Sequence, residues 1–372
     1  MYREKKRSCT AAARAAMVLL TIAAAAAAES FDEYFLAGSF TLPAGAGPFD
    51  VLADGRVVTL VGGDLYTETA VGSEAFGLPG SLPAGDIPSF GAAFVRVSPG
   101  GARIAVGNNG GADFDNFQVG VFSLSGLSGT WYSANHFDAE WYDDDHLALT
   151  AGVFGSPSFV SVLDVNSTDA ANPVNPVVVG DIGGASAGVT FDDAGNLYTG
   201  NGFAIGGPSG TGTIKFFDNA DWLAPLGGAE PVDFENDGTL IADLLSAASL
   251  GFDAKGHLFV GGGDFGGDLD YAALVHAAAI TDALDGLGPA DAFDPEQVRR
   301  FDPDGANDMN FYAVNFNNVA RELYIRAGLT VYRYAIPEPA SGLLLAGGVF
   351  SMLIHRRRTQ CSLRVGDARS HD

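Results

Sequence analysis

A strand, a tight turn and a second strand recur along this chain, and the recurrence limits the folds that it can adopt. The two clearest copies are residues 189–200 (VTFDDAGNLYTG) and 250–261 (LGFDAKGHLFVG). In each copy an apolar strand leads into a turn rich in Asp and Gly, and the second strand stops at a glycine. Weaker copies lie at residues 49–58, 95–104, 141–148 and 314–325. Six copies of one supersecondary unit predict a repeat architecture built from strands.

The spacing of the copies predicts a β-propeller. The first apolar residue after each turn occupies positions 57, 104, 147, 197, 258 and 323, so the intervals are 47, 43, 50, 61 and 65 residues. A four-stranded propeller blade takes about 40 to 50 residues, so three intervals match and the last two carry insertions. Further strands are predicted at residues 118–124, 159–165, 213–217 and 329–334. We therefore predict an all-β chain with six four-stranded blades, and an irregular pair of β-sandwiches is the structural alternative.

Two finer expectations follow from the same pattern. Propellers commonly close by pairing an N-terminal strand with the last blade, because this removes an exposed sheet edge. Residues 34–42 (YFLAGSFTL) form the one strand-like stretch before the first copy, so we expect them in the same blade as residues 329–334. In the insertion that follows position 267, residues 272–287 fit a strand followed by a short helix, which periodicity alone does not settle.

The N-terminus carries the pattern of a secretory signal peptide. Residues 1–28 combine a basic start, an apolar stretch centred on residues 17–20 and an alanine run suited to cleavage. Cys9 and Cys361 are the only cysteines, and each lies in a segment that we expect the mature protein to lose. We therefore predict a mature protein without a disulfide bond.

The C-terminus has three elements in a fixed order. Pro337, Glu338 and Pro339 come first, the uncharged residues 340–354 follow, and Arg356, Arg357 and Arg358 come next. As a helix the uncharged segment is about 22 Å long, shorter than the ~30 Å hydrocarbon core of a bilayer. Snorkelling arginines can cover part of this mismatch, and the positive-inside rule keeps them cytoplasmic. A plain C-terminal anchor helix is the alternative interpretation.

This order of elements resembles the PEP-CTERM sorting signal of bacteria, over about the last 37 residues. The resemblance implies recognition and cleavage by an exosortase, with transient anchoring in the membrane and delivery to the cell surface or extracellular matrix. It departs from the family's pattern in continuing for fourteen residues after the basic run. The expected organisation is a signal peptide (1–28), a β-propeller domain (29–335), a sorting segment with a short transmembrane helix (336–358) and a cytoplasmic tail (359–372).

The body of the chain is strongly acidic. Residues 29–355 keep 10 of the 20 basic residues and 42 of the 45 acidic residues, a net formal charge of −32. Such a surface repels nucleic acid and anionic lipid and attracts divalent cations. We therefore expect no nucleic-acid partner, and solubility outside the cell is the simplest role of the charge.

One acidic stretch has the composition of a calcium loop. Asp302, Asp304, Asn307 and Asp308 place four oxygen-bearing side chains within seven residues. Calcium takes about six to eight oxygen ligands, so these residues are candidate Ca²⁺ ligands. The spacing is not that of an EF-hand, and a solvated acidic turn is the alternative. No Zn²⁺-protease, phosphate-loop or Ser-His-Asp signature is evident, so no catalytic residue is assigned.

The strand-turn-strand units resemble NHL-type and related six-bladed propellers over most of the body. Six-bladed propellers resembling lactonases hold a metal in the axial channel with Asp, Asn and Glu ligands. That resemblance implies Asn108, Asn201 and Asp264, each of which follows a strand and a glycine, as metal-ligand candidates, with turn residues as the alternative.

Two classes of function remain open. The first is a non-enzymatic binding or structural protein of the extracellular polysaccharide matrix, with polysaccharide or another surface protein as its partner. The second is a metal-dependent hydrolase of the lactonase kind. Three or more carboxylate or amide side chains converging on the axis would favour the hydrolase.

Overall fold

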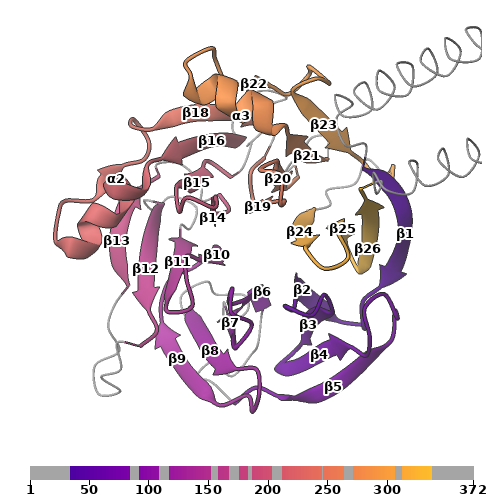
Figure 1. The fold of residues 1–372 in the computed structure, drawn as a ribbon. Coiled ribbons are helices and arrows are strands. Elements are labelled where there is room, and N and C mark those ends of the chain that lie inside the picture. Colours follow the sequence, from indigo (N-terminus) through magenta and orange to yellow (C-terminus); the bar gives the residue numbers. More distant parts are fainter. Residues whose placement is uncertain are drawn as a thin grey trace, which may run out of the picture. The chain divides into compact units, whose positions relative to one another are not determined.

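A computed structural model describes residues 34–83, 92–108, 117–151, 158–166, 176–182, 187–202, 212–244, 246–263, 271–305 and 312–336. Residues 36–334 form one compact unit. Its strands make six separate sheets, each with at least four strands, arranged in a ring (Figure 1). The innermost strands of neighbouring blades contact one another all the way around this ring. The chain is therefore an all-β, six-bladed propeller, and the predicted alternative of paired sandwiches is wrong.

The first three blades follow one another in sequence. Blade 1 contains β2 (Ala46–Val51), β3 (Val57–Val61), β4 (Asp64–Glu68) and β5 (Phe76–Ser81). Blade 2 contains β6 (Ala92–Val97), β7 (Arg103–Asn108), β8 (Gln118–Ser123) and β9 (Gly129–Ser133). Blade 3 contains β10 (Asp138–Trp141), β11 (His146–Ala151), β12 (Phe159–Asp164) and β13 (Val177–Asp181), with β17 (Val232–Asp233) as a fifth strand.

The other three blades use segments that are more distant in sequence. Blade 4 contains β14 (Thr190–Phe191), β15 (Leu197–Gly200), β16 (Gly212–Phe217) and β18 (Thr239–Leu244), with β22 (Ala290–Asp291) as a fifth strand. Blade 5 contains β19 (Ser249–Phe252), β20 (Leu258–Gly261), β21 (Ala272–Val275) and β23 (Val298–Phe301). Blade 6 contains β24 (Ala313–Asn317), β25 (Glu322–Ala327), β26 (Thr330–Ala335) and β1 (Phe35–Thr41).

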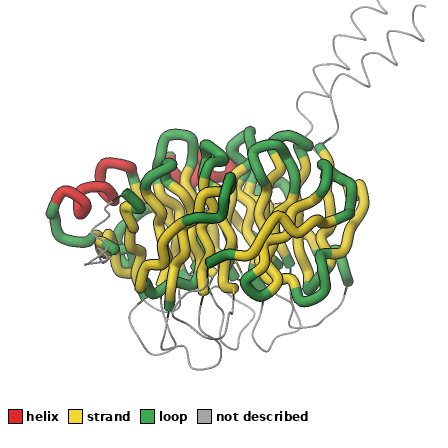
Figure 2. Tube along the Cα trace, turned by 90° about the horizontal axis from the view of Figure 1, so that it is seen from below, coloured by secondary structure: helices red, strands yellow, loops and turns green. Residues whose placement is uncertain are grey.

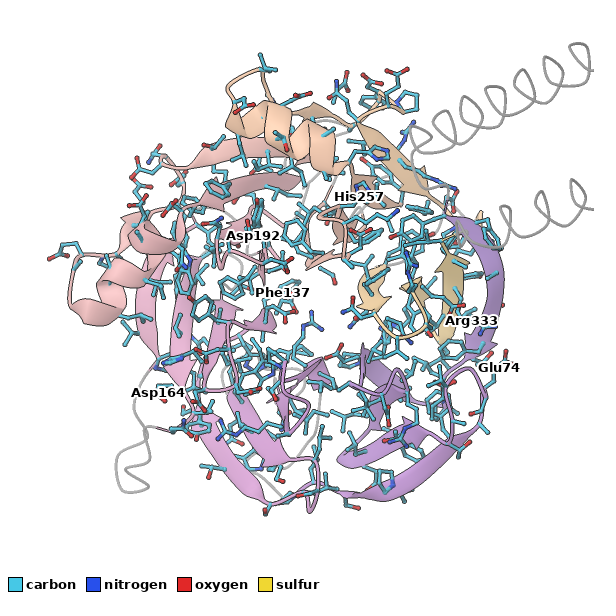
Figure 3. All side chains as sticks on the ribbon, viewed as in Figure 1. Glu74, Phe137, Asp164, Asp192, His257 and Arg333 are labelled. Atoms are coloured by element: carbon cyan, nitrogen blue, oxygen red, sulfur yellow. The ribbon has the colours of Figure 1, made fainter. Side chains whose placement is uncertain are left out.

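Ring closure follows the predicted scheme. β1 is the outer strand of blade 6 and lies beside β26, and the Leu42 amide donates to the Leu329 carbonyl at 2.9 Å. At the periphery Arg333 on β26 forms an ion pair with Glu74 in blade 1 at 3.7 Å (Figure 3). The prediction that the N-terminal strand completes the last blade is confirmed.

The repeated turn joins the first and second strands of each blade. In blade 4 the Asp192 carboxylate accepts hydrogen bonds from the amides of Ala194 and Asn196, both at 2.9 Å. Gly195 has a φ of +78°, a left-handed conformation that glycine adopts readily because it has no Cβ atom. Asp253 and Gly256 repeat this arrangement in blade 5. The Asp-x-x-Gly pattern therefore marks the turn because the aspartate satisfies its amides and the glycine adopts its left-handed backbone.

The two long repeats carry insertions that brace the preceding blade. The insertion of blade 4 forms α2 (Asn219–Leu223), the 3-10 turn η1 (Ala224–Gly227) and β17, which pairs in parallel with β13 of blade 3. Trp222 of α2 is fully buried in an apolar cluster that draws on blades 3 and 4. α2 and the helix of the other insertion, α3 (Ala277–Leu284), lie at the same face of the ring (Figure 2). We call the insertion of blade 4 the first strap.

The second strap belongs to blade 5 and follows the expected strand-then-helix pattern. It forms α3 (Ala277–Leu284) and β22, which pairs in parallel with β18 of blade 4. Ile280 of α3 is buried in the cluster shared by blades 4 and 5, and the Ala277 amide donates to His257 Nδ1 at 3.0 Å. The straps cover the outer edges of blades 3 and 4, where unpaired backbone groups would otherwise face solvent.

Candidate functional site

Strand register places one residue of each blade at an equivalent position on the innermost strand. The first apolar residue after each turn (positions 57, 104, 147, 197, 258 and 323) lies on the second strand of its blade. Each of the equivalent residues pairs with the residue that comes next on that second strand. We call this set the axial ring: Asp50, Arg96, Glu140, Thr190, Gly251 and Asn315. Its three charged members belong to blades 1, 2 and 3. Phe137, which directly precedes β10, marks this central region (Figure 3).

Arg96 connects blade 2 to blade 3. Its Nη2 lies 2.6 Å from Asp138 Oδ1, and its Nε donates to the Ala139 carbonyl at 2.6 Å. Nε also lies 3.4 Å from Glu140 Oε2, while Nη1 donates to the carbonyl of Val95 at 3.0 Å. The arginine side chain is only 10% exposed. Its guanidinium is therefore held by a carboxylate and two backbone carbonyls, with Glu140 as a more distant partner.

Asp50 connects blade 1 to the blades on either side. Its carboxylate accepts from the Val97 amide of blade 2 at 2.5 Å and from the Val51 amide at 2.7 Å. The side-chain amide of Asn315 in blade 6 also donates to it. We refer to Asp50, Arg96, Asp138 and Glu140 together as the axial charge cluster. This cluster and its amide partners link four consecutive blades at the centre of the ring.

The cluster contains more negative than positive charge. Burial raises the pKa of Asp50 and of Asp138, and the Arg96 guanidinium only partly offsets the effect. The pKa of Glu140 is raised to about 8, mainly by burial. The Arg96 guanidinium lowers this pKa, and the negative charges of Asp50 and Asp138 raise it further. Although burial lowers the pKa of Arg96, the three carboxylates raise it overall. Near neutral pH the cluster therefore favours a proton on Glu140, which reduces its excess charge.

The convergence of these groups has a structural explanation. Three carboxylates and one side-chain amide meet near the axis, as a hydrolase would require, but Asp138 and Glu140 pair with the guanidinium of Arg96, and the Asn315 amide donates to Asp50. Asp138 Oδ2 is buried and makes no hydrogen bond of ordinary geometry. Within the described part of the chain, no three His, Cys, Asp or Glu side chains are disposed to hold a metal ion. The cluster thus joins blades through the protein's own cation.

The lactonase-type candidates occupy matching places in two blades. Asn108 is the last residue of β7, and Asn201 directly follows β15, so both stand where the second strand of a blade ends. Asn108 is 1% exposed. Asn201 Oδ1 is buried and has no hydrogen-bond partner among the described residues. Asp264 lies outside the described residues, so the proposed set of three is only partly placed.

The candidate calcium loop is also partly placed. Asp302 accepts from the Gly305 amide at 2.9 Å, and Asp304 accepts from the Tyr312 hydroxyl at 2.5 Å. These bonds make Asp302 and Asp304 members of a hydrogen-bonded turn after β23. Asn307 and Asp308 lie outside the described residues, so calcium binding here stays a prediction.

The predicted sorting residues, Pro337 to Pro339 and Arg356 to Arg358, lie outside the described residues as well. In the ranges that the structure does describe, no helix is long and apolar enough to span a membrane. The signal peptide, the transmembrane segment and the tail therefore stay sequence-based predictions.

The axial charge cluster was missed in the sequence, although a signal for it was present. When the six copies are aligned on their turns, the column that becomes the axial ring contains Asp, Arg, Glu, Thr, Gly and Asn. Charged residues on an innermost strand indicate contacts between blades, because a lone buried charge is unfavourable. Asp50 and Arg96 belong to weak copies and Glu140 directly precedes another, and the low similarity of these copies hid the column.

No protein-family model matches the chain, and no curated protein matches its sequence. Among solved structures, it resembles the PQQ-bound aldose sugar dehydrogenase from Streptomyces coelicolor, with 10% identity, a TM-score of 0.52, and coverage of 82% of this chain and 98% of that one. It also resembles streptogramin B lyase, with 11% identity, a TM-score of 0.44, and coverage of 82% of this chain and 98% of that one. The C-terminal WD40 domain of Sif2 has 13% identity and a TM-score of 0.44, with coverage of 79% of this chain and 82% of that one. At such identities a likeness shows the fold alone, and this chain is a six-bladed β-propeller by fold.

Proposed function

We propose that this protein is an exported β-propeller that is released by an exosortase to the cell surface or extracellular matrix. There it acts as a non-enzymatic binding or structural protein, with polysaccharide or another surface protein as its partner. The sequence of the two ends supports export and cleavage, and the architecture of the ring supports the binding role. The observation that carries the proposal is the position of the first and last strands.

Both predicted cleavage sites lie outside the strands that close the ring. β1 begins at Phe35, after the predicted signal peptide ends at residue 28, and β26 ends at Ala335, before Pro337. Removal of both ends would therefore leave every strand of blade 6 in place. A propeller that needed either terminal segment to close would not survive such processing.

The charge of the body favours release over permanent anchoring. Ala335 and Ile336 alone separate β26 from Pro337, and two extended residues span roughly 7 Å. That is within the ~8 Å Debye length at physiological salt. An uncut chain would hold a body of net charge −32 near a membrane surface that is usually anionic. Cleavage relieves that repulsion.

The axial contacts favour binding over catalysis. Asp50, Arg96 and Asp138 each make hydrogen bonds that cross from one blade to the next. Groups engaged in this way stabilise the ring and are poorly suited to transfer protons or to hold a hydrolytic metal. Recognition then falls to the outer surfaces and loops of the propeller, as is common for a rigid scaffold.

Mass spectrometry of the protein from its native host tests the proposal. We expect the surface or matrix fraction to yield peptides from the propeller and none that runs from Leu343 to Arg356. A Glu338→Ala variant should instead accumulate uncut in the membrane fraction, because it alters the Pro-Glu-Pro element. An intact wild-type peptide from Leu343 to Arg356 as the main species would overturn exosortase processing.

A further inference from the structure

One exposed basic side chain of the propeller lies against two aromatic rings. All ten Lys and Arg residues of the body lie in the described ranges, and most contact acidic side chains or backbone carbonyls. Arg300 is exposed, and among the described residues its side chain makes no hydrogen bond or ion pair. Its guanidinium carbon instead lies 5.1 Å from the ring centroid of Phe293 and 5.6 Å from that of Tyr271.

The fold explains why these three side chains meet. Arg300 on β23 pairs with Ala273 on β21 in antiparallel register, so Tyr271, two residues from Ala273, lies on the same face of the blade. Phe293 comes from the end of the second strap. Its amide donates to Asp291 at 2.8 Å, which fixes the turn that carries it. We call Tyr271, Phe293 and Arg300 the Arg300 patch.

The patch is arranged for recognition more than for stability. Phe293 is 68% exposed, so its ring buries little area. Aromatic rings near a guanidinium restrict its motion through cation–π attraction. Its N–H groups remain available, and they form a planar fork that matches a carboxylate in bidentate geometry. The exposed ring beside it can pack against the apolar face of a sugar.

The acidic surroundings limit what can bind. The Asp291 and Asp294 carboxylates accept hydrogen bonds within their own turn, and neither forms an ion pair with Arg300. Beyond the ~8 Å Debye length at physiological salt, the other acidic residues act weakly. A long polyanion would cross much of this acidic surface, whereas a single carboxylate on a sugar meets one cation and one ring.

We propose that the Arg300 patch binds a uronic acid residue at the end or branch of an extracellular polysaccharide. Arg300 pairs with the sugar carboxylate, and Phe293 stacks on the sugar ring. This inference rests on the proposed matrix-binding function and names the site and ligand class for it.

The test is calorimetric titration of the full chain with trigalacturonic acid and with its methyl ester, which has the same backbone without the charge. We expect the acid to bind and the ester to bind at least about tenfold more weakly, because the charge-assisted pair is lost. Arg300→Gln and Phe293→Ala should each weaken binding of the acid by about tenfold. Arg321→Gln is the matched control, since Arg321 is an exposed arginine on the turn of blade 6.

The possible outcomes separate this inference from the proposed function. Equal losses in Arg300→Gln and Arg321→Gln would mean that net charge alone matters and would overturn the site. Equal affinity for the acid and the ester would overturn carboxylate recognition while leaving matrix binding intact. A wild-type chain that binds neither the trisaccharides nor any matrix polysaccharide would overturn this inference and the polysaccharide-binding form of the proposed function, and would leave export and cleavage to the mass-spectrometric test.

Discussion

The axis and the rim of this propeller hold neighbouring blades together by different physical means. At the axis, blades 1 to 3 are joined by Asp50, Arg96 and Asp138. At the rim, blades 3 to 5 are joined by straps that bury Trp222 and Ile280. The axial positions of blades 4 and 5 are Thr190 and Gly251, which carry no charge. The blades with long insertions therefore lack the ionic contacts that the shorter blades have at the axis.

This difference shows two ways of solving one problem. A blade buries apolar surface only against its neighbours, so every junction needs its own stabilisation. An ionic contact is compact and directional, but it depends on pH and leaves a buried charge when one partner is lost. A strap takes more residues, but its apolar packing is insensitive to pH. Mutations at the two regions should therefore differ in how their effects respond to pH.

Removal of the axial cation should have the largest effect. Arg96→Met leaves Asp50, Asp138 and Glu140 without their counter-charge, so we expect the free energy of unfolding to fall by about 3–5 kcal/mol at pH 8. The loss should be smaller at pH 5, where protonation neutralises carboxylates. Urea unfolding at the two pH values measures both. Arg103→Met is the control, because its ion pair with Asp145 is partly exposed and should contribute about 1 kcal/mol or less. Equal losses in both variants would contradict the axial role.

A cavity in the second strap should have a somewhat smaller effect. Ile280 is 5% exposed and belongs to the cluster between blades 4 and 5, so Ile280→Ala should lower the free energy of unfolding by about 3 kcal/mol. The loss should be the same at pH 5 and pH 8. Leu284→Ala on the same helix is the control, since Leu284 is 41% exposed and its truncation should change stability by about 0.5 kcal/mol or less. A strong pH dependence of the Ile280→Ala effect would remove the contrast between axis and rim.

Titration of the axis itself should have the smallest effect of the three. The pKa of Glu140 is raised from 4.5 to about 8, so between these values the folded chain binds more protons than the unfolded chain. The contribution of Glu140 to the free energy of unfolding is therefore greatest below about pH 4.5. It falls as the pH rises from about 4.5 to about 8 and then levels off. We expect a loss of about 2 kcal/mol between pH 6 and pH 9, measured by urea unfolding.

A neutral substitute at position 140 checks the origin of that slope. Glu140→Gln should match the wild type below about pH 4.5 and exceed its stability by a growing margin up to about pH 8, because it cannot ionise in either state. Asp193→Asn removes an exposed carboxylate from the turn of blade 4 and should keep the wild-type slope. An unchanged slope in Glu140→Gln would show that another group causes the pH dependence.

Much of the fold could be predicted because its signals are local. Asp192 and Gly195 determine one turn by side-chain bonding and backbone conformation within five residues, and Asp253 and Gly256 do the same in blade 5. Counting such turns predicted six blades, and the two long intervals predicted the insertions. Closure by residues 34–42 followed from the need to pair the last open edge.

The candidate site could be predicted far less well, because its contacts are not local. Arg96 meets Asp138 across 42 residues, and Asp50 meets Asn315 across 265. No spacing rule relates such positions, and the charges belong to the weakest copies of the repeat. Asn108 and Asn201 lie at the ends of the second strands of blades 2 and 4, and strand order determines that much. Whether they act together depends on side-chain directions that a repeat pattern does not contain.

The sequence by itself determined the all-β class, the six repeats, the closing strand and the positions of the insertions. Those properties depend on turn chemistry and on strand periodicity, which act over a few residues. Only the tertiary structure decided that Asp138 and Glu140 pair with Arg96, that each insertion braces the blade before it, and that Arg300 contacts the rings of Phe293 and Tyr271. These arrangements arise when the ring closes, because closure brings distant strands side by side and sets the burial that governs their charges.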